Sequence, residues 1–213
     1  QATAPVSTPS VAVAPVGRSP LAVRNNEDMN AIKGMKNAYT VQYDSLAQIL
    51  AAQGTFSERE SDTNMGSKLV FELMSYQDQY VVSPNDDKAS KDLVRYSADG
   101  ITCSDGTDVK EHLLHLKEEL NYKNARVNQR YVLVGALVSA ERSKDFDGQL
   151  MQIDLSPKSR GQFDRYLIQS AYDIGKGKFT ADEAKVLEMT AEVATNGANQ
   201  KYTLVKFATF KAA

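Results

Sequence analysis

Apolar and polar residues alternate over residues 68–82, which predicts a long β-strand. Leu69, Phe71 and Leu73 share one face of this segment. The opposite face is mixed and carries Val70, Glu72, Met74, Tyr76, Asp78 and Tyr80. Period-two alternation of this kind is typical of a strand that buries one face.

Further strands are predicted from alternation, from β-branched residues and from flanking turn signals. They cover residues 93–96, 101–103, 150–155, 187–193 and 202–210. The Val-, Leu- and Ala-rich run 126–140 predicts a central strand bent by a bulge around Gly135. Asn196-Gly197 is the strongest hairpin signal in the chain and joins the last two strands.

Helical spacing and capping residues predict the remaining elements. Asp44 can cap a short helix that ends near Gly54, and a second helix runs from Thr107 to about Leu120. Ser156 followed by Pro157 predicts the start of a third helix, which ends at Gly175. Over 180–185, the capping-box spacing of a Thr and a Glu predicts one more helical turn.

These elements predict a mostly antiparallel α+β fold. Hairpin connections outnumber helical crossovers, which favours antiparallel pairing. We expect a curled, OB-like sheet or barrel of five to seven strands with two or three helices, plus an extended N-terminal arm.

The first residues differ in composition from the rest. Four of the six prolines are Pro5, Pro9, Pro15 and Pro20, and small residues lie between them. Such a segment cannot form a helix or fill a core. We expect residues 1–28 to be a flexible Pro/Ala/Val-rich arm and residues 29–213 to be a single domain. The arm is either a disordered leader or a segment that orders on a partner or a neighbouring subunit.

Composition excludes several classes of protein. Of 213 residues, 42% are hydrophobic and 24% charged, with a net charge of −2, which excludes histone-like attraction to nucleic acid. No apolar run approaches the roughly 18 residues of a membrane helix, so we expect no membrane contact. A single cysteine excludes an internal disulfide framework and fits a cytoplasmic protein, in the host cytoplasm if viral. Since the chain opens at Gln1 without a signal-peptide pattern, we expect either a truncation or the earlier removal of a signal peptide before a mature Gln, with truncation favoured.

No catalytic or metal-binding constellation is visible. His112, His115 and Glu119 have helical spacing but lack a further histidine, so we interpret them as a solvated polar helix face. Cys103 is interpreted as a structural thiol, because nothing resembles a protease signature. We therefore expect no enzyme activity, no cofactor and no bound metal.

The charges are segregated along the chain. Basic residues dominate residues 120–140, 155–178 and 193–213, whereas acids cluster elsewhere. Aromatic residues lie beside several of these cations, a combination that binds single-stranded nucleic acid through phosphate contacts and base stacking. The candidate phosphate-binding residues are Arg95, Arg126, Arg130, Lys201 and Lys206. The candidate stacking residues are Tyr76, Tyr80, Tyr96 and Tyr131. The alternative is that the tyrosines pack in the sheet and the lysines protect strand edges.

Residues 93–100 (Leu-Val-Arg-Tyr-Ser-Ala-Asp-Gly) and 155–163 (Leu-Ser-Pro-Lys-Ser-Arg-Gly-Gln-Phe) resemble parts of phage accessory proteins that bind single-stranded DNA through OB-like folds. That resemblance implies a non-enzymatic accessory role in replication or recombination. The alternative function is a structural or assembly protein, such as a virion component or complex subunit. Such a protein would contact a partner or itself through residues 1–28 and through the Tyr202–Phe210 strand.

Overall fold

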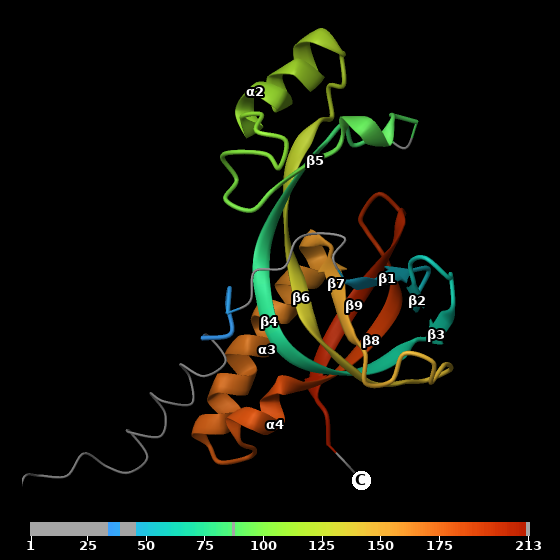
Figure 1. Cartoon of the computed structure of the whole chain (residues 1–213), viewed down its shortest axis with the longest axis vertical. Coiled ribbons are helices and arrows are strands. Elements are labelled where there is room, and N and C mark those ends of the chain that lie inside the picture. Colours follow the sequence, from blue (N-terminus) through green and yellow to red (C-terminus); the bar gives the residue numbers. More distant parts are fainter. Residues whose placement is uncertain (1–33, 39–45, 87, 212–213) are drawn as a thin grey trace, which may run out of the picture.

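The structure is a computed structural model that describes residues 34–38, 46–86 and 88–211. The predicted arm, residues 1–28, and the predicted cap Asp44 lie outside the described residues. Within them, a strongly curled mixed sheet forms a half-barrel, and three helices, α2, α3 and α4, pack on it or project from it (Figure 1). The predicted α+β class is confirmed.

The described part of the chain contains nine strands, more than the predicted five to seven. They are β1 (Ala47–Ala52), β2 (Thr55–Glu58), β3 (Asn64–Gly66), β4 (Lys68–Ser83), β5 (Arg95–Ser97), β6 (Arg126–Ala140), β7 (Leu150–Leu155), β8 (Val186–Thr195) and β9 (Lys201–Thr209). Their order is β3-β2-β1-β7-β6-β4-β8-β9, and β5 pairs with the far end of β4. Neighbours are antiparallel except β1 and β7, so the expectation of mostly antiparallel pairing is confirmed.

The predicted helix before Gly54 is wrong, because this segment forms β1 and the turn into β2. Ile49 is buried and pairs with both Glu58 and Ile153. Pairing on both sides outweighs the weak local preference for helix. Gly54 has a φ of +78° and serves the β1–β2 turn rather than the end of a helix.

The other helix predictions are confirmed. The helix from Thr107 appears as α2 (Val109–Leu114), continued by the π-helical turn η2 (His115–Glu119). Ser156 caps α3 (Pro157–Gly175) by accepting a hydrogen bond from the Ser159 backbone N–H at 3.3 Å. α4 (Ala181–Lys185) begins with the predicted capping box. No helix among the described residues is long and apolar enough to cross a membrane.

β4 and β6 pair along their whole length and bend together as the backbone of the half-barrel. A β-carbon on Gly135 would lie 2.1 Å from the Glu72 carbonyl oxygen, so only glycine allows the strands to approach this closely. The register shifts opposite Gly135, where Met74 is the extra residue on β4. The predicted bulge is therefore present, with its extra residue on the partner strand.

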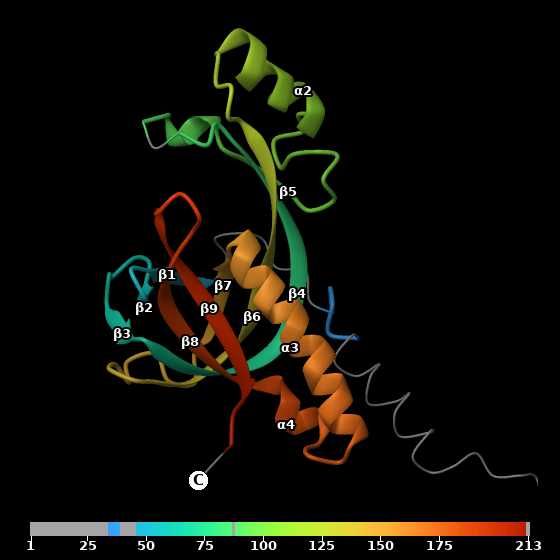
Figure 2. The ribbon, with the colours of Figure 1, turned by 180° about the vertical axis from the view of Figure 1, so that it is seen from behind.

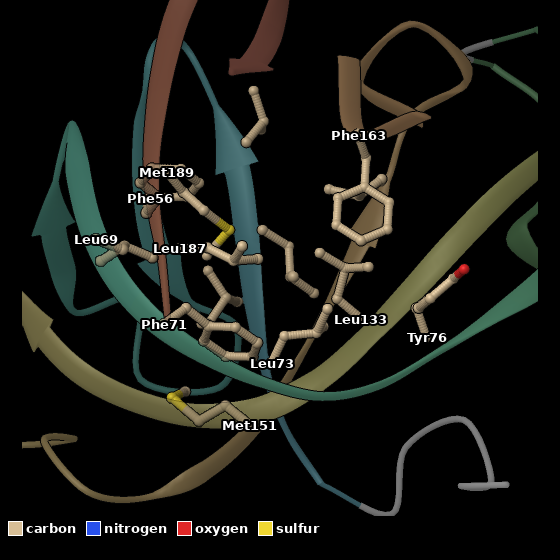
Figure 3. Packing of buried hydrophobic residues seen from close by; sticks show 14 of the residues in the cluster. Phe56, Leu69, Phe71, Leu73, Tyr76, Leu133, Met151, Phe163, Leu187 and Met189 are labelled. Carbon is tan, nitrogen blue, oxygen red and sulfur yellow. The ribbon is translucent and has the colours of Figure 1, made fainter. Parts of the chain in front are cut away.

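The concave face of the curl and one face of α3 form the main hydrophobic core (Figure 3). Phe163 projects from α3 into this core beside Tyr76 and Leu133, and its side chain is fully buried. Truncating a buried aromatic residue of this kind to alanine costs about 3–5 kcal/mol. The position of α3 on the sheet is thus fixed by packing.

Residues 84–125, which connect β4 to β6, form a projection that we call the lobe. It contains β5, α2, η2 and the short 3₁₀ turn η1 (Lys91–Leu93). A small separate core holds it together and consists of Val82, Cys103, Val109, Leu116 and Ala125 with their neighbours. The lobe stands at one end of the molecule, and α4 lies at the other (Figures 1 and 2).

Candidate functional site

Two of the predicted stacking tyrosines lie in the main core. Tyr76 and Tyr131 are 4% and 6% exposed, and their rings meet Phe163 edge to face at 5.3 and 5.9 Å. The prediction that these two rings stack on bases is wrong, because α3 packs on the face of the sheet that presents them. The alternative interpretation of tyrosines as sheet-packing residues describes both.

Tyr131 also belongs to a polar network that joins β6 to α3. Its hydroxyl donates a hydrogen bond to Asp164 at 3.0 Å, and the Arg160 guanidinium lies 4.6 Å from the ring centroid. Arg160 also donates to the Gln129 side-chain oxygen at 3.0 Å. Burial raises the pKa of Tyr131. The network fastens the start of α3 to the sheet.

The other two predicted tyrosines are half-buried near the lobe. Gln129 donates to the Tyr80 hydroxyl at 3.1 Å, and the Tyr80 ring lies beneath the Gly100 turn. Tyr96 is on β5, paired with Val81 of β4.

The predicted phosphate-binding cations do not gather on one wall. Arg95 pairs with Asp105 in the lobe, and Arg126 is exposed where β6 begins. Arg130 alternates with the inward-facing Tyr131 and pairs with Asp154 at 2.8 Å. Arg126 and Arg130 share β6, and Lys201 and Lys206 share β9. The prediction of a single surface that includes all five cations is therefore wrong, because the curl turns β6 and β9 in different directions.

Two of the three basic segments nevertheless come together, because α3 and β9 lie side by side (Figure 2). The Val205 backbone N–H donates to the Ser159 hydroxyl at 3.0 Å, and the Tyr166 and Thr209 hydroxyls are 3.2 Å apart. A hollow of about 530 Å³ lies between α3 and the end of β9, and Tyr166 and Thr209 form part of its lining. We call it the α3–β9 groove. Its lining includes the cations Arg165, Lys178, Lys206 and Lys211, and the aromatic residues Tyr166, Phe179 and Phe207.

Carboxylates neutralise part of this positive charge. Asp173, in the groove lining, accepts from Lys178 at 2.7 Å, and this contact holds the pKa of Asp173 below its usual value. Lys206 pairs with Glu192 of β8 at 2.6 Å. Over the ranges the structure describes, Arg165 makes no ion pair. The groove lining thus carries four cations against one carboxylate.

The outer side of α3 extends the positive surface. Lys158, Arg165 and Tyr172 follow at seven-residue intervals, so they line up along nearly one side of the helix. Tyr172 is 58% exposed, with the Lys176 ammonium 5.5 Å from its ring centroid. The Lys158 ammonium lies 3.8 Å from the ring centroid of Tyr202 on β9. Arg165 and Tyr172 are not among the predicted site residues, although their seven-residue spacing in a predicted helix was a usable signal.

The two lobe histidines have different surroundings. His112 is 7% exposed and its Nε2 contacts the Leu93 carbonyl oxygen at 2.9 Å, so the interpretation of His112 as a solvated residue is wrong. His115 contacts Glu119 at 2.9 Å on the exposed side. Among the residues that the structure describes, no group of three or more His, Cys, Asp or Glu side chains is arranged to hold a metal ion. Cys103 is buried in the lobe core, and burial raises its pKa.

Comparisons with protein-family models, with curated proteins and with solved structures found no match to this chain. We therefore infer a function from the chemistry of the α3–β9 groove and of the surface around it.

Proposed function

We propose that the protein is a non-enzymatic binding protein for single-stranded nucleic acid and that the α3–β9 groove is its binding surface. The observation that carries this proposal is the convergence of two basic segments, 155–178 and 193–213, on one hollow lined by four cations and one carboxylate. Cationic grooves flanked by aromatic rings bind single strands without needing a catalytic group.

The two kinds of side chain serve different parts of the strand. Arg165 and Lys211, on opposite walls of the groove, contact phosphates, and Lys158 and Lys201 continue this contact beyond the groove. Tyr172, with its exposed ring, offers a face for a base. Each stacked base contributes about 1–3 kcal/mol by alanine substitution. Lys158 and Arg165 are separated by about 10 Å along the helix axis, so one strand can contact both.

The proposal also includes more detailed expectations from the sequence. These are that the curled sheet is OB-like, that the protein is an accessory factor in replication or recombination, that it comes from a phage, and that it is cytoplasmic. The convergence of cations at α3 and β9 supports the binding function alone.

The test is fluorescence anisotropy of labelled oligo-dT with the full chain over a series of salt concentrations. For single strands, the logarithm of the affinity falls with the logarithm of salt by about 0.7 per phosphate contact. Replacing Arg165→Ala and Lys211→Ala together removes two contacts, so we expect weaker binding and a slope smaller by about 1.4.

The matched control changes the same residue types outside the groove. Arg142→Ala with Lys144→Ala removes two exposed cations from the loop between β6 and β7 and should leave the affinity unchanged. Wild-type protein that takes up no oligo-dT at low salt would refute the proposal. Equal losses in the groove variant and the control variant would refute the location.

A further inference from the structure

The lobe carries the opposite charge to the groove. Over residues 84–125, carboxylates outnumber Lys and Arg nine to six. In contrast, residues 156–179 of α3 and its flanks carry five Lys and Arg against two carboxylates. One chain therefore presents an acidic lobe and a basic α3.

The acidic end has an exposed helical face with an apolar centre. Glu111, Leu114 and Glu118 follow at spacings of three and four residues along α2 and η2, so they lie on one side of this helix. All three are exposed, and Leu114 is 52% exposed. This face is complementary to a hollow that carries cations and aromatic residues, because the carboxylates can pair with the cations and the leucine can pack on the rings.

The α3–β9 groove has the charge and the apolar residues that would complement this face. Within the described ranges, neither Arg165 nor Lys211 makes an ion pair, and Phe179 and Phe207 contribute apolar lining. The lobe and α4 lie at opposite ends of the molecule, with the groove between α3 and β9 on the α4 side (Figures 1 and 2). The lobe of a chain consequently cannot reach the groove of the same chain, and the two surfaces can meet only between copies.

We propose that the protein associates head to tail, with the Glu111–Leu114–Glu118 face of one copy in the α3–β9 groove of the next. Such a contact is heterologous, since it joins different surfaces, and it repeats into open chains unless the rotation closes a ring. Exposed charge pairs make it weak and sensitive to salt. The groove is the one assigned above to nucleic acid, so a strand displaces the neighbouring lobe and self-association regulates access to the groove.

The predicted strand addition through Tyr202–Phe210 is a different form of self-contact. It stays a prediction, and at Val205 the edge of β9 already donates to Ser159 of α3. The head-to-tail contact uses the exposed charges Glu111, Glu118, Arg165 and Lys211, and the half-buried Phe179 and Phe207.

The test is sedimentation velocity of the full chain, freed of nucleic acid by nuclease and anion exchange. At about 0.05 M salt, where charges are weakly screened, we expect species heavier than the 23.4 kDa monomer that increase with protein concentration. At about 1 M salt they should dissociate to monomer.

Two variants then separate the surfaces. The lobe variant carries Glu111→Gln, Leu114→Ser and Glu118→Gln, and the groove variant carries Arg165→Ala and Lys211→Ala, as in the oligo-dT experiment. Each alone should be monomeric, because each lacks one half of the contact. Their mixture should form a dimer and nothing larger, since one intact groove meets one intact lobe. Circular dichroism melting of each variant checks that it is folded.

Wild-type protein that stays monomeric at low salt, or a mixture that stays monomeric, would overturn head-to-tail association. Association of the groove variant by itself would also overturn it. None of these outcomes bears on oligo-dT binding, which is measured separately, so the two proposals can fail independently.

Discussion

The Tyr131 hydroxyl on β6 donates a hydrogen bond to Asp164 on α3 over 3.0 Å. With the Arg160 guanidinium beside the same ring, this contact fixes the first turns of α3 on the sheet. The wall of the groove formed by α3 is consequently positioned by residues that do not line the groove. Tyr131 thus has a structural role, and this role can be separated from ligand binding.

We expect Tyr131→Phe to lower the free energy of unfolding by about 1 kcal/mol, because it removes the hydrogen bond to Asp164 and a long one from Arg160 and keeps the ring. Urea unfolding measures this loss. Affinity for oligo-dT should be unchanged, in contrast to the effect of replacing Arg165. A loss of affinity as large as that of the groove variant would indicate that Tyr131 contributes to binding after all.

Asp154 should make stability depend on pH. Burial raises its pKa above the ordinary 3.8, although Arg130 at 2.8 Å acts in the opposite direction. The folded state therefore holds the Asp154 proton more tightly than the unfolded state, and its contribution to stability is lost as the pH rises through the raised pKa. We expect this part of the pH dependence, measured by urea unfolding, to disappear in Asp154→Asn. An unchanged profile would contradict the assignment.

Replacing only one partner of the Asp154–Arg130 ion pair is predicted to lower the free energy of unfolding more than replacing both partners. Asp154→Leu alone leaves the Arg130 charge without its partner and should cost about 2 kcal/mol. Because the Arg130 side chain is 32% exposed, the loss is smaller than for a fully buried pair. Adding Arg130→Met should recover most of the stability in thermal and urea unfolding. A double variant as unstable as the single one would show that the ion pair itself stabilises the sheet.

Asp173 should limit the affinity of the groove for anions. Asp173→Asn releases Lys178 from its ion pair and removes a negative charge, so we expect oligo-dT to bind about 3- to 10-fold more tightly. The slope against salt should also steepen by about 0.7. The matched control is Asp182→Asn, which releases Lys185 from a similar 2.7 Å pair on α4 outside the groove lining. Equal gains from both variants would indicate a general charge effect.

Gly135 is predicted to be the least replaceable glycine of the sheet. Gly135→Ala places a β-carbon 2.1 Å from the Glu72 carbonyl oxygen, so β4 and β6 must separate, at a cost of about 3 kcal/mol or more. Gly161→Ala is the control, because its β-carbon meets no atom within 4 Å and alanine favours the helix by about 1 kcal/mol. Opposite shifts of the melting temperature are expected. A tolerated Gly135→Ala would mean that the strands relax easily.

Local signals predicted the elements that local energetics decide. The alternation over 68–82 and the capping residues Ser156 and Thr180 each act through neighbours within a few residues, and β4, α3 and α4 follow from them. β1 was missed because its strand conformation depends on Ile153, about a hundred positions away in the chain. Short segments of this kind take the structure that their partners impose.

Sequence also determined which side chains are cations and which are aromatic, and that two basic segments exist near the end of the chain. Only the tertiary structure decided which of them share a surface, because the curl of the sheet directs each strand to a different side. It brought Arg165 and Lys211 to one groove, left Arg126 and Arg130 elsewhere, and buried Tyr76 and Tyr131 beneath α3. The physical reason is that charge and periodicity are properties of single residues and short segments, whereas a binding surface is a property of distances between segments.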